Sequence, residues 1–111
     1  MDTRTADREV IEKALADYAA IPYAHGEVVT QTVFDRASDH YLPMIVGSEN
    51  RRRVHGCLVH VDIVGDKIWI QADGTERGVA PTLVRGGIAP ERILLAFSSA
   101  GAYPYSDVLA A

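Results

Sequence analysis

Apolar side chains recur along residues 7–20 at the spacing that places them on one side of a helix. This stripe consists of Val10, Ile11, Ala14, Leu15 and Tyr18. Charged residues fill most of the remaining positions, and Ile21-Pro22 follows directly. Because the residue before a proline is pushed out of the α region, the pattern predicts an amphipathic helix over residues 7–20.

Four shorter segments that follow are rich in β-branched residues or alternate between apolar and polar positions, as β-strands do. They are residues 27–35, 40–47, 53–64 and 67–72. Pro43 cannot donate a hydrogen bond to a neighbouring strand. We therefore expect the second of these strands at an edge of the sheet or at a bulge.

The last two of these segments flank Gly65-Asp66, a sequence typical of a two-residue hairpin turn. The turn sets Val64 opposite Lys67, and alternation along each strand then sorts the side chains onto two faces. The face predicted to be core consists of Cys57, Val59, Val61, Ile63, Ile68, Ile70 and Ala72. The opposite face consists of His60, Asp62, Trp69 and Gln71, with Asp73 at its far end.

After this hairpin the pattern predicts a second helix, which begins either after Thr75 as N-cap or later, with Pro81 in its first turn. Gly86-Gly87 ends it, because glycine accepts the left-handed conformation that follows many helices. A turn over residues 89–92 and an apolar strand over residues 93–97 come next. The remaining tail has the composition of a loop.

The composition fits a single folded domain over residues 1–111, with 48% hydrophobic and 23% charged residues. The segments together predict an α+β fold: an N-terminal helix, an antiparallel β-meander of about four strands with a central hairpin, a second helix and a final strand. A single cysteine excludes an internal disulfide. Neither a signal peptide nor a membrane span is predicted, so we expect a cytoplasmic protein.

The polar face of the hairpin is the strongest candidate for function. Tryptophan is enriched in binding hot spots, and Trp69 stands there among charged and amide side chains. The residues predicted to bind a partner are Trp69, Asp62, His60, Gln71 and Asp73. The alternative is that a helix or the tail of the same chain covers this face.

A run of three arginines offers a second candidate surface. Arg51, Arg52 and Arg53 follow a turn, where guanidinium groups are suited to nucleic-acid phosphates or to an acidic partner. The net charge of −4 disfavours general affinity for DNA.

Catalytic and metal chemistry are also possible in principle. A histidine and an aspartate such as His60 and Asp62 are able to form an oriented acid–base pair. No nucleophile motif accompanies them, so we expect no enzyme. His55 and Cys57 are expected on the face opposite to His60. Because too few ligands then converge, we expect no metal centre and no cofactor.

Three blocks of the sequence carry a family resemblance. Residues 39–42, 53–63 and 67–76 read DHYL, RVHGCLVHVDI and KIWIQADGTE. These blocks resemble the XisI-like family, whose members are called fdxN element excision controlling factors. The tail departs from the family's pattern.

The resemblance implies a cyanobacterial-type accessory protein. Family members act with a companion, XisH, which resembles restriction-type endonucleases, in the programmed excision of a DNA element by a separate recombinase. We therefore predict a non-catalytic regulatory protein that binds a XisH-like partner through the polar hairpin face. The alternative functions are a DNA-binding accessory factor using Arg51–Arg53 and a small enzyme using His60 and Asp62. An edge strand also invites pairing between copies of the chain, as in a homo-oligomer.

Overall fold

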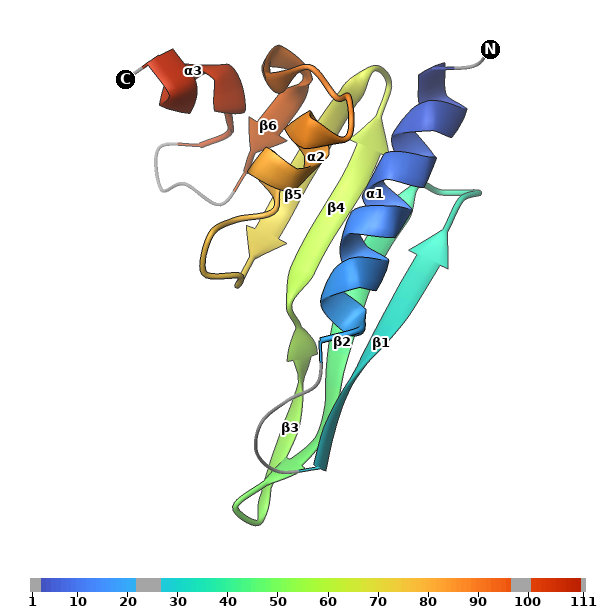
Figure 1. The fold of residues 1–111 in the computed structure, drawn as a ribbon, viewed down its shortest axis with the longest axis vertical. Coiled ribbons are helices and arrows are strands. Elements are labelled where there is room, and N and C mark those ends of the chain that lie inside the picture. Colours follow the sequence, from blue (N-terminus) through green and yellow to red (C-terminus); the bar gives the residue numbers. More distant parts are fainter. Residues whose placement is uncertain (1–2, 22–26, 97–100, 111) are drawn as a thin grey trace.

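A computed structural model describes residues 3–21, 27–96 and 101–110. These residues form one mixed sheet with helices packed against it (Figure 1). The elements in chain order are α1 (Thr3–Ala19), β1 (Glu27–Asp35), β2 (His40–Glu49), β3 (Arg52–Cys57), β4 (Val59–Val64), β5 (Lys67–Asp73), α2 (Ala80–Arg85), the 3₁₀ turn η1 (Pro90–Arg92), β6 (Ile93–Leu95), β7 (Tyr103–Pro104) and α3 (Tyr105–Ala110). The predicted α+β class is confirmed.

The strands are arranged in the order β1–β2–β4–β5–β6–β7, and β3 also pairs with β2. The strands from β1 to β5 pair antiparallel, as expected for a meander. The predicted final strand is present as β6 and runs parallel to β5. A parallel neighbour needs a crossover connection, and α2 lies within that crossover. Residue 97, at the predicted end of this strand, lies outside the described residues.

One face of the sheet forms the core, and α1 and α2 pack on it (Figure 1). Ile11 and Leu15 of α1 and Leu83 of α2 are fully buried together with Val61 and Ile70 of the sheet. Each fully buried aliphatic side chain contributes about 1.5–3 kcal/mol, so a slip that exposed this set would be costly. The predicted apolar stripe of α1 is therefore the side of the helix that faces the sheet.

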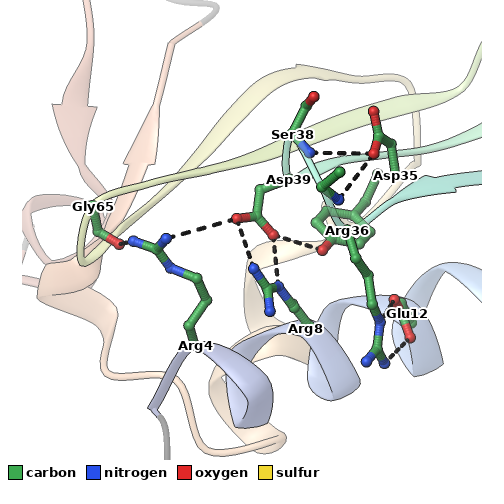
Figure 2. Close-up of polar contacts among 10 residues, drawn as sticks. Arg4, Arg8, Glu12, Asp35, Arg36, Ser38, Asp39 and Gly65 are labelled. Carbon is green, nitrogen blue, oxygen red and sulfur yellow. Dashed lines mark hydrogen bonds and ion pairs between the residues drawn. The ribbon is translucent and has the colours of Figure 1, made fainter.

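A buried aspartate joins α1 to the β1–β2 hairpin. Arg8 donates from Nε to Asp39 Oδ1 at 2.8 Å and from Nη2 to Oδ2 at 3.2 Å, and the Tyr41 hydroxyl donates to Oδ1 at 2.7 Å (Figure 2). The hydrogen bond from Arg8 is the main reason that the pKa of Asp39 lies below its ordinary value, and the bond from Tyr41 acts in the same direction.

A second buried aspartate joins α1 to the C-terminal part of the sheet. Both carboxylate oxygens of Asp7 accept hydrogen bonds from the Arg92 guanidinium. Arg92 Nε also donates to the backbone carbonyl of Asp66 at 2.9 Å. A single arginine on η1 therefore holds both the start of α1 and the β4–β5 turn.

The predicted strand over residues 53–64 is two strands, because the pairing with β2 shifts by one residue at Leu58. In β3, Cys57 lies opposite Met44, whereas in β4, Val61 lies opposite Tyr41. The extra residue places Cys57 and Val59 on opposite faces. The prediction that Cys57 belongs to the core is wrong, since this residue is exposed.

The β4–β5 hairpin contains a second irregularity of one residue. The predicted register is confirmed from the Val64–Lys67 pair back to the Val61–Ile70 pair, and then shifts so that His60 lies opposite Ala72. Gln71 is therefore the extra residue of a β-bulge. The bulge moves Ala72 to the face of His60, so its predicted place in the core is also wrong, and Ala72 is exposed.

The C-terminal third differs from its prediction mainly in the tail. Of the two predicted starts for α2, the later one is correct, with Val79 at the N-cap and Pro81 in the first turn. Gly87 follows this helix with φ of 114°, as expected for a glycine stop. The tail contains β7 and α3 rather than only a loop. No helix among the described residues is long and apolar enough to cross a membrane.

Candidate functional site

The face of the sheet opposite to α1 and α2, here the open face, carries the candidate site. Strand pairing places on it Val29, Val33, His40, Leu42, Met44, Val46, Cys57, His60, Asp62, Val64, Trp69 and Leu94. The exposed fractions of Val29, Val33 and Val64 are 56%, 47% and 57%. Apolar side chains gathered on one exposed surface are typical of a binding site.

A polar cluster centred on Asp62 interrupts these apolar residues. His40 Nδ1 lies 2.7 Å and His60 Nε2 lies 2.8 Å from the same carboxylate oxygen, Oδ1. Gln71 Nε2 donates to the other oxygen, Oδ2, at 3.3 Å. The Asp62 side chain is only 12% exposed, and burial of a carboxylate is costly unless it is hydrogen-bonded. The three neighbours satisfy that requirement.

The backbone brings these side chains together. His40 of β2 lies opposite Asp62 of β4, and Asp62 lies opposite Trp69 of β5. His60 and Asp62 are two positions apart on one strand, so they point to the same face. The bulge at Gln71 keeps its amide on that face, within reach of Asp62.

The hydrogen bond to Asp62 raises the pKa of His40 above its ordinary value, because the carboxylate stabilises the charged imidazolium. Asp35 and Asp39 raise the pKa of His40 further through their negative charges. Asp62 therefore favours a positive charge on His40.

Four of the five residues predicted to bind a partner lie together. His60, Asp62 and Gln71 form the cluster, and half-buried Trp69 stands opposite Asp62, with Leu94 on its other side. None of these four is fully enclosed by the described helices, so the predicted polar face is accessible.

Asp73, the fifth predicted residue, has a different role. It lies opposite Val59, on the side of the core, because the bulge reverses the alternation before it. Its carboxylate accepts hydrogen bonds from the backbone N–H groups of Thr75 at 3.0 Å and Val79 at 2.7 Å. Asp73 therefore organises the loop into α2, and the prediction that it lies on the polar hairpin face is wrong.

His40 is the residue that the sequence failed to connect to this site. The meander placed its strand beside the segment that contains β4, but the register between the two strands was not predicted, and its imidazole is 22 positions from Asp62 in the chain. The reasoning that separated the histidines by face is wrong as well. The shift at Leu58 places His55, opposite Val46, on the same face as His60.

The arginine run lies at the tip of the β2–β3 hairpin, which projects beyond the end of β4 (Figure 1). Asn50 and Arg51 are the two central residues of the turn, and Arg52 and Arg53 begin β3. All three arginines are exposed. Within the described part of the chain, none of their side chains makes an ion pair or a hydrogen bond.

A hollow of about 450 Å³ lies between α1 and α2, lined by Val10, Ala14 and Gly86 among other residues. It lies on the helix side of the sheet, and neither His60 nor Asp62 lines it. The pair proposed for an enzyme is therefore not part of this hollow.

Comparison with known proteins identifies the family. The XisI protein family matches residues 1–108, nearly the whole chain. The chain belongs to the XisI family. No curated protein matches this XisI-family chain.

Two solved structures from Anabaena variabilis ATCC 29413 resemble this XisI-family protein in fold and sequence. A XisI-like protein is 31% identical, with a TM-score of 0.77, over 87% of this chain and 89% of its own. The fdxN element excision controlling factor XisI is 26% identical, with a TM-score of 0.72, over 87% of this chain and 94% of its own. The resemblance inferred from the three sequence blocks is confirmed.

Proposed function

We propose that this XisI-family chain is a non-catalytic accessory protein that controls a XisH-like nuclease by docking on it through the open face. The observation that carries the proposal is the asymmetry of the sheet. One face is packed by α1 and α2, while the other presents three exposed valines, half-buried Trp69 and the polar cluster at Asp62. Interfaces commonly combine aromatic anchors with a polar group that fixes orientation.

The role in excision rests on the family and on one similar structure. The fdxN element excision controlling factor of Anabaena variabilis shares the fold and is 26% identical to this chain over the matched region. A controller of a nuclease needs a surface for its partner, and the open face has the composition for that task.

Affinity for a purified XisH-like protein tests the proposal. We expect Trp69→Ala and Val33→Lys to weaken binding at least about thirtyfold and tenfold, because they remove an aromatic anchor and place a charge in an apolar contact. Ala16→Lys, on the exposed side of α1, is the matched control and keeps wild-type affinity. Circular dichroism confirms that each variant is folded. Equal affinity for all three variants would remove the open face from the proposal.

The hairpin tip supports a second function, contact with DNA. Its three exposed guanidinium groups have no partner in the described part of the chain and are therefore available to phosphates. If they bind DNA, replacing Arg51, Arg52 and Arg53 by serine reduces the dependence of log K on log salt by about 0.9 for each phosphate that the variant no longer neutralises. Arg85→Ser, on α2, is the control. Absence of salt-dependent binding by the wild-type chain would exclude this function.

Self-association stays a prediction. β1 pairs only with β2 in the described sheet, so its outer edge has backbone groups available to a second copy. Sedimentation of the purified chain decides between a monomer and a dimer.

A further inference from the structure

We propose that His40, His60 and Asp62 form a binding site for a divalent transition-metal ion of the Zn²⁺ type. The proposal concerns the isolated chain and does not depend on a nuclease partner. One ligand atom from each residue lies within 4.8 Å of the other two. Two imidazoles and a carboxylate are common ligands of zinc, and three protein ligands are usual where a further position stays open.

The convergence comes from strand pairing rather than from flexible loops. His40 and Asp62 are direct partners across β2 and β4, and His60 is two positions from Asp62 on the same face. Ligands held by neighbouring strands of one sheet are preorganised, so little conformational entropy is lost when an ion binds.

The two nitrogen–oxygen distances require only a small adjustment. Both histidine nitrogens now lie 2.7–2.8 Å from Asp62 Oδ1, as hydrogen-bonded groups do. Around a tetrahedral zinc ion with bonds of about 2.0–2.2 Å, neighbouring ligand atoms are about 3.3 Å apart. A change of roughly half an ångström is within the range of side-chain rotation. Each imidazole must bind in its neutral form, with the lone pair of the coordinating nitrogen directed to the ion.

The surroundings favour this use of the three groups. Gln71 donates to Asp62 Oδ2, which leaves Oδ1 directed at the histidines, in the manner of a residue that orients a metal ligand. Asp35 lies opposite His40 on β1 and adds negative charge nearby. With two nitrogen donors and one oxygen, the set suits zinc, nickel or copper better than magnesium or calcium, which prefer oxygen.

The site is accessible to an ion from solvent. The side chains of His40 and His60 are 51% and 36% exposed, while Asp62, at 12%, lies at the bottom of the cluster. The fourth coordination position therefore faces outward, where water or a side chain of another protein is able to occupy it.

Titration of the tag-free, chelator-treated chain tests the site. We expect saturable, one-to-one binding of Zn²⁺ by calorimetry and, with Co²⁺, the visible absorption of a low-coordinate complex. His40→Ala and His60→Ala weaken binding at least about tenfold, and Asp62→Asn also weakens it. Mg²⁺ gives no signal.

The matched control is His55→Ala, an exposed histidine on the same face outside the cluster, which binds as tightly as wild type. His25 lies outside the described residues and is present in every variant, so it does not account for a difference between them. Absence of zinc binding, binding that persists in both His40→Ala and His60→Ala, or an equal loss in His55→Ala would overturn the proposal. Thermal unfolding without added metal confirms that each variant is folded.

Discussion

Arg8 and Asp39 form a two-point ion pair between α1 and the β1–β2 hairpin, in which the carboxylate is buried and the guanidinium is partly exposed. Asp39 has φ of 57°, a conformation that asparagine also tolerates, so Asp39→Asn removes the charge without straining the backbone. We expect this variant to lose about 1–2 kcal/mol of unfolding free energy at pH 7. Breaking a fully buried pair costs about 3–5 kcal/mol, and solvent reduces that cost here. Urea unfolding measures it.

The control for this prediction is Asp17→Asn. Asp17 pairs with Lys13 on the exposed side of α1, and pairs of this kind contribute about 0.5 kcal/mol or less. If Asp39→Asn loses no more unfolding free energy than Asp17→Asn, the structural role of the buried pair is contradicted.

The same variant predicts a pH dependence. Because Arg8 lowers the pKa of Asp39 in the folded state, the stabilisation is complete above the unfolded-state pKa of about 3.9 and is lost as the pH falls through the folded pKa. The stability difference between wild type and Asp39→Asn is therefore constant from pH 7 to about pH 5 and shrinks below about pH 4. A difference at pH 3 equal to that at pH 7 would refute this assignment.

The turn at the hairpin tip predicts a stabilising substitution. Asn50 and Arg51 both have positive φ, at 52° and 65°, as a type I′ turn requires. An arginine in that region is strained by about 1–2 kcal/mol, whereas glycine is unstrained but loses about 0.5–1 kcal/mol of chain entropy. Arg51→Gly should therefore raise the unfolding free energy by about 0.5–1 kcal/mol. Arg52→Gly, one position later in β3, should lower the unfolding free energy. Equal losses of unfolding free energy in the two variants would contradict the turn assignment.

Gly47 predicts a destabilising substitution. Its φ is 151°, and an added Cβ would collide with the backbone of Glu27 and Val28 on β1. Because backbone rather than a flexible side chain must move, Gly47→Ala should cost about 3 kcal/mol. Gly56→Ala is the matched control, since nothing lies within 4 Å of its added Cβ. Thermal unfolding gives the melting temperature of each variant. Similar melting temperatures would be inconsistent with the close contact between Gly47 and β1.

Cys57 predicts a chemical probe of the open face. The residue is exposed, its Sγ donates to the Val59 carbonyl at 3.0 Å, and partial burial raises the pKa of the thiol above its ordinary value. Since only the thiolate reacts, the native chain should react with a maleimide slowly at neutral pH and faster as the pH rises. A saturating partner on the open face should slow this reaction. Unchanged labelling in the complex would place the partner elsewhere.

Side-chain periodicity and turn residues were sufficient to predict α1 and the part of the β4–β5 hairpin next to its turn. The stripe of α1, the Gly65-Asp66 turn and the four register pairs next to that turn follow from side-chain periodicity and turn chemistry. The shift at Leu58 does not, because apolar residues on either side of it fit a continuous strand. It is set by the partner strand β2, which buries Tyr41 beside Val61 but leaves Met44 beside Cys57 half-exposed.

The candidate site shows the same division. His60 and Asp62 share a face because they are two positions apart, and this was predictable from the sequence. The place of His40 depends on the register between β2 and β4, which is altered by the shift at Leu58 and carries no turn signal. Asp73 was misplaced because the bulge at Gln71 reverses the alternation, and one extra residue leaves no clear trace in a hydrophobic pattern.

The pair between Asp7 and Arg92 spans 85 positions of the chain. During synthesis, α1 leaves the ribosome long before the arginine that pairs with its Asp7. The apolar stripe of α1 packs mainly on strands that precede η1, but the pair that fixes Asp7 forms only after η1 has been translated. Long-range contacts of this kind slow folding, so attachment of the N-terminal part of α1 to η1 is expected to be a late step.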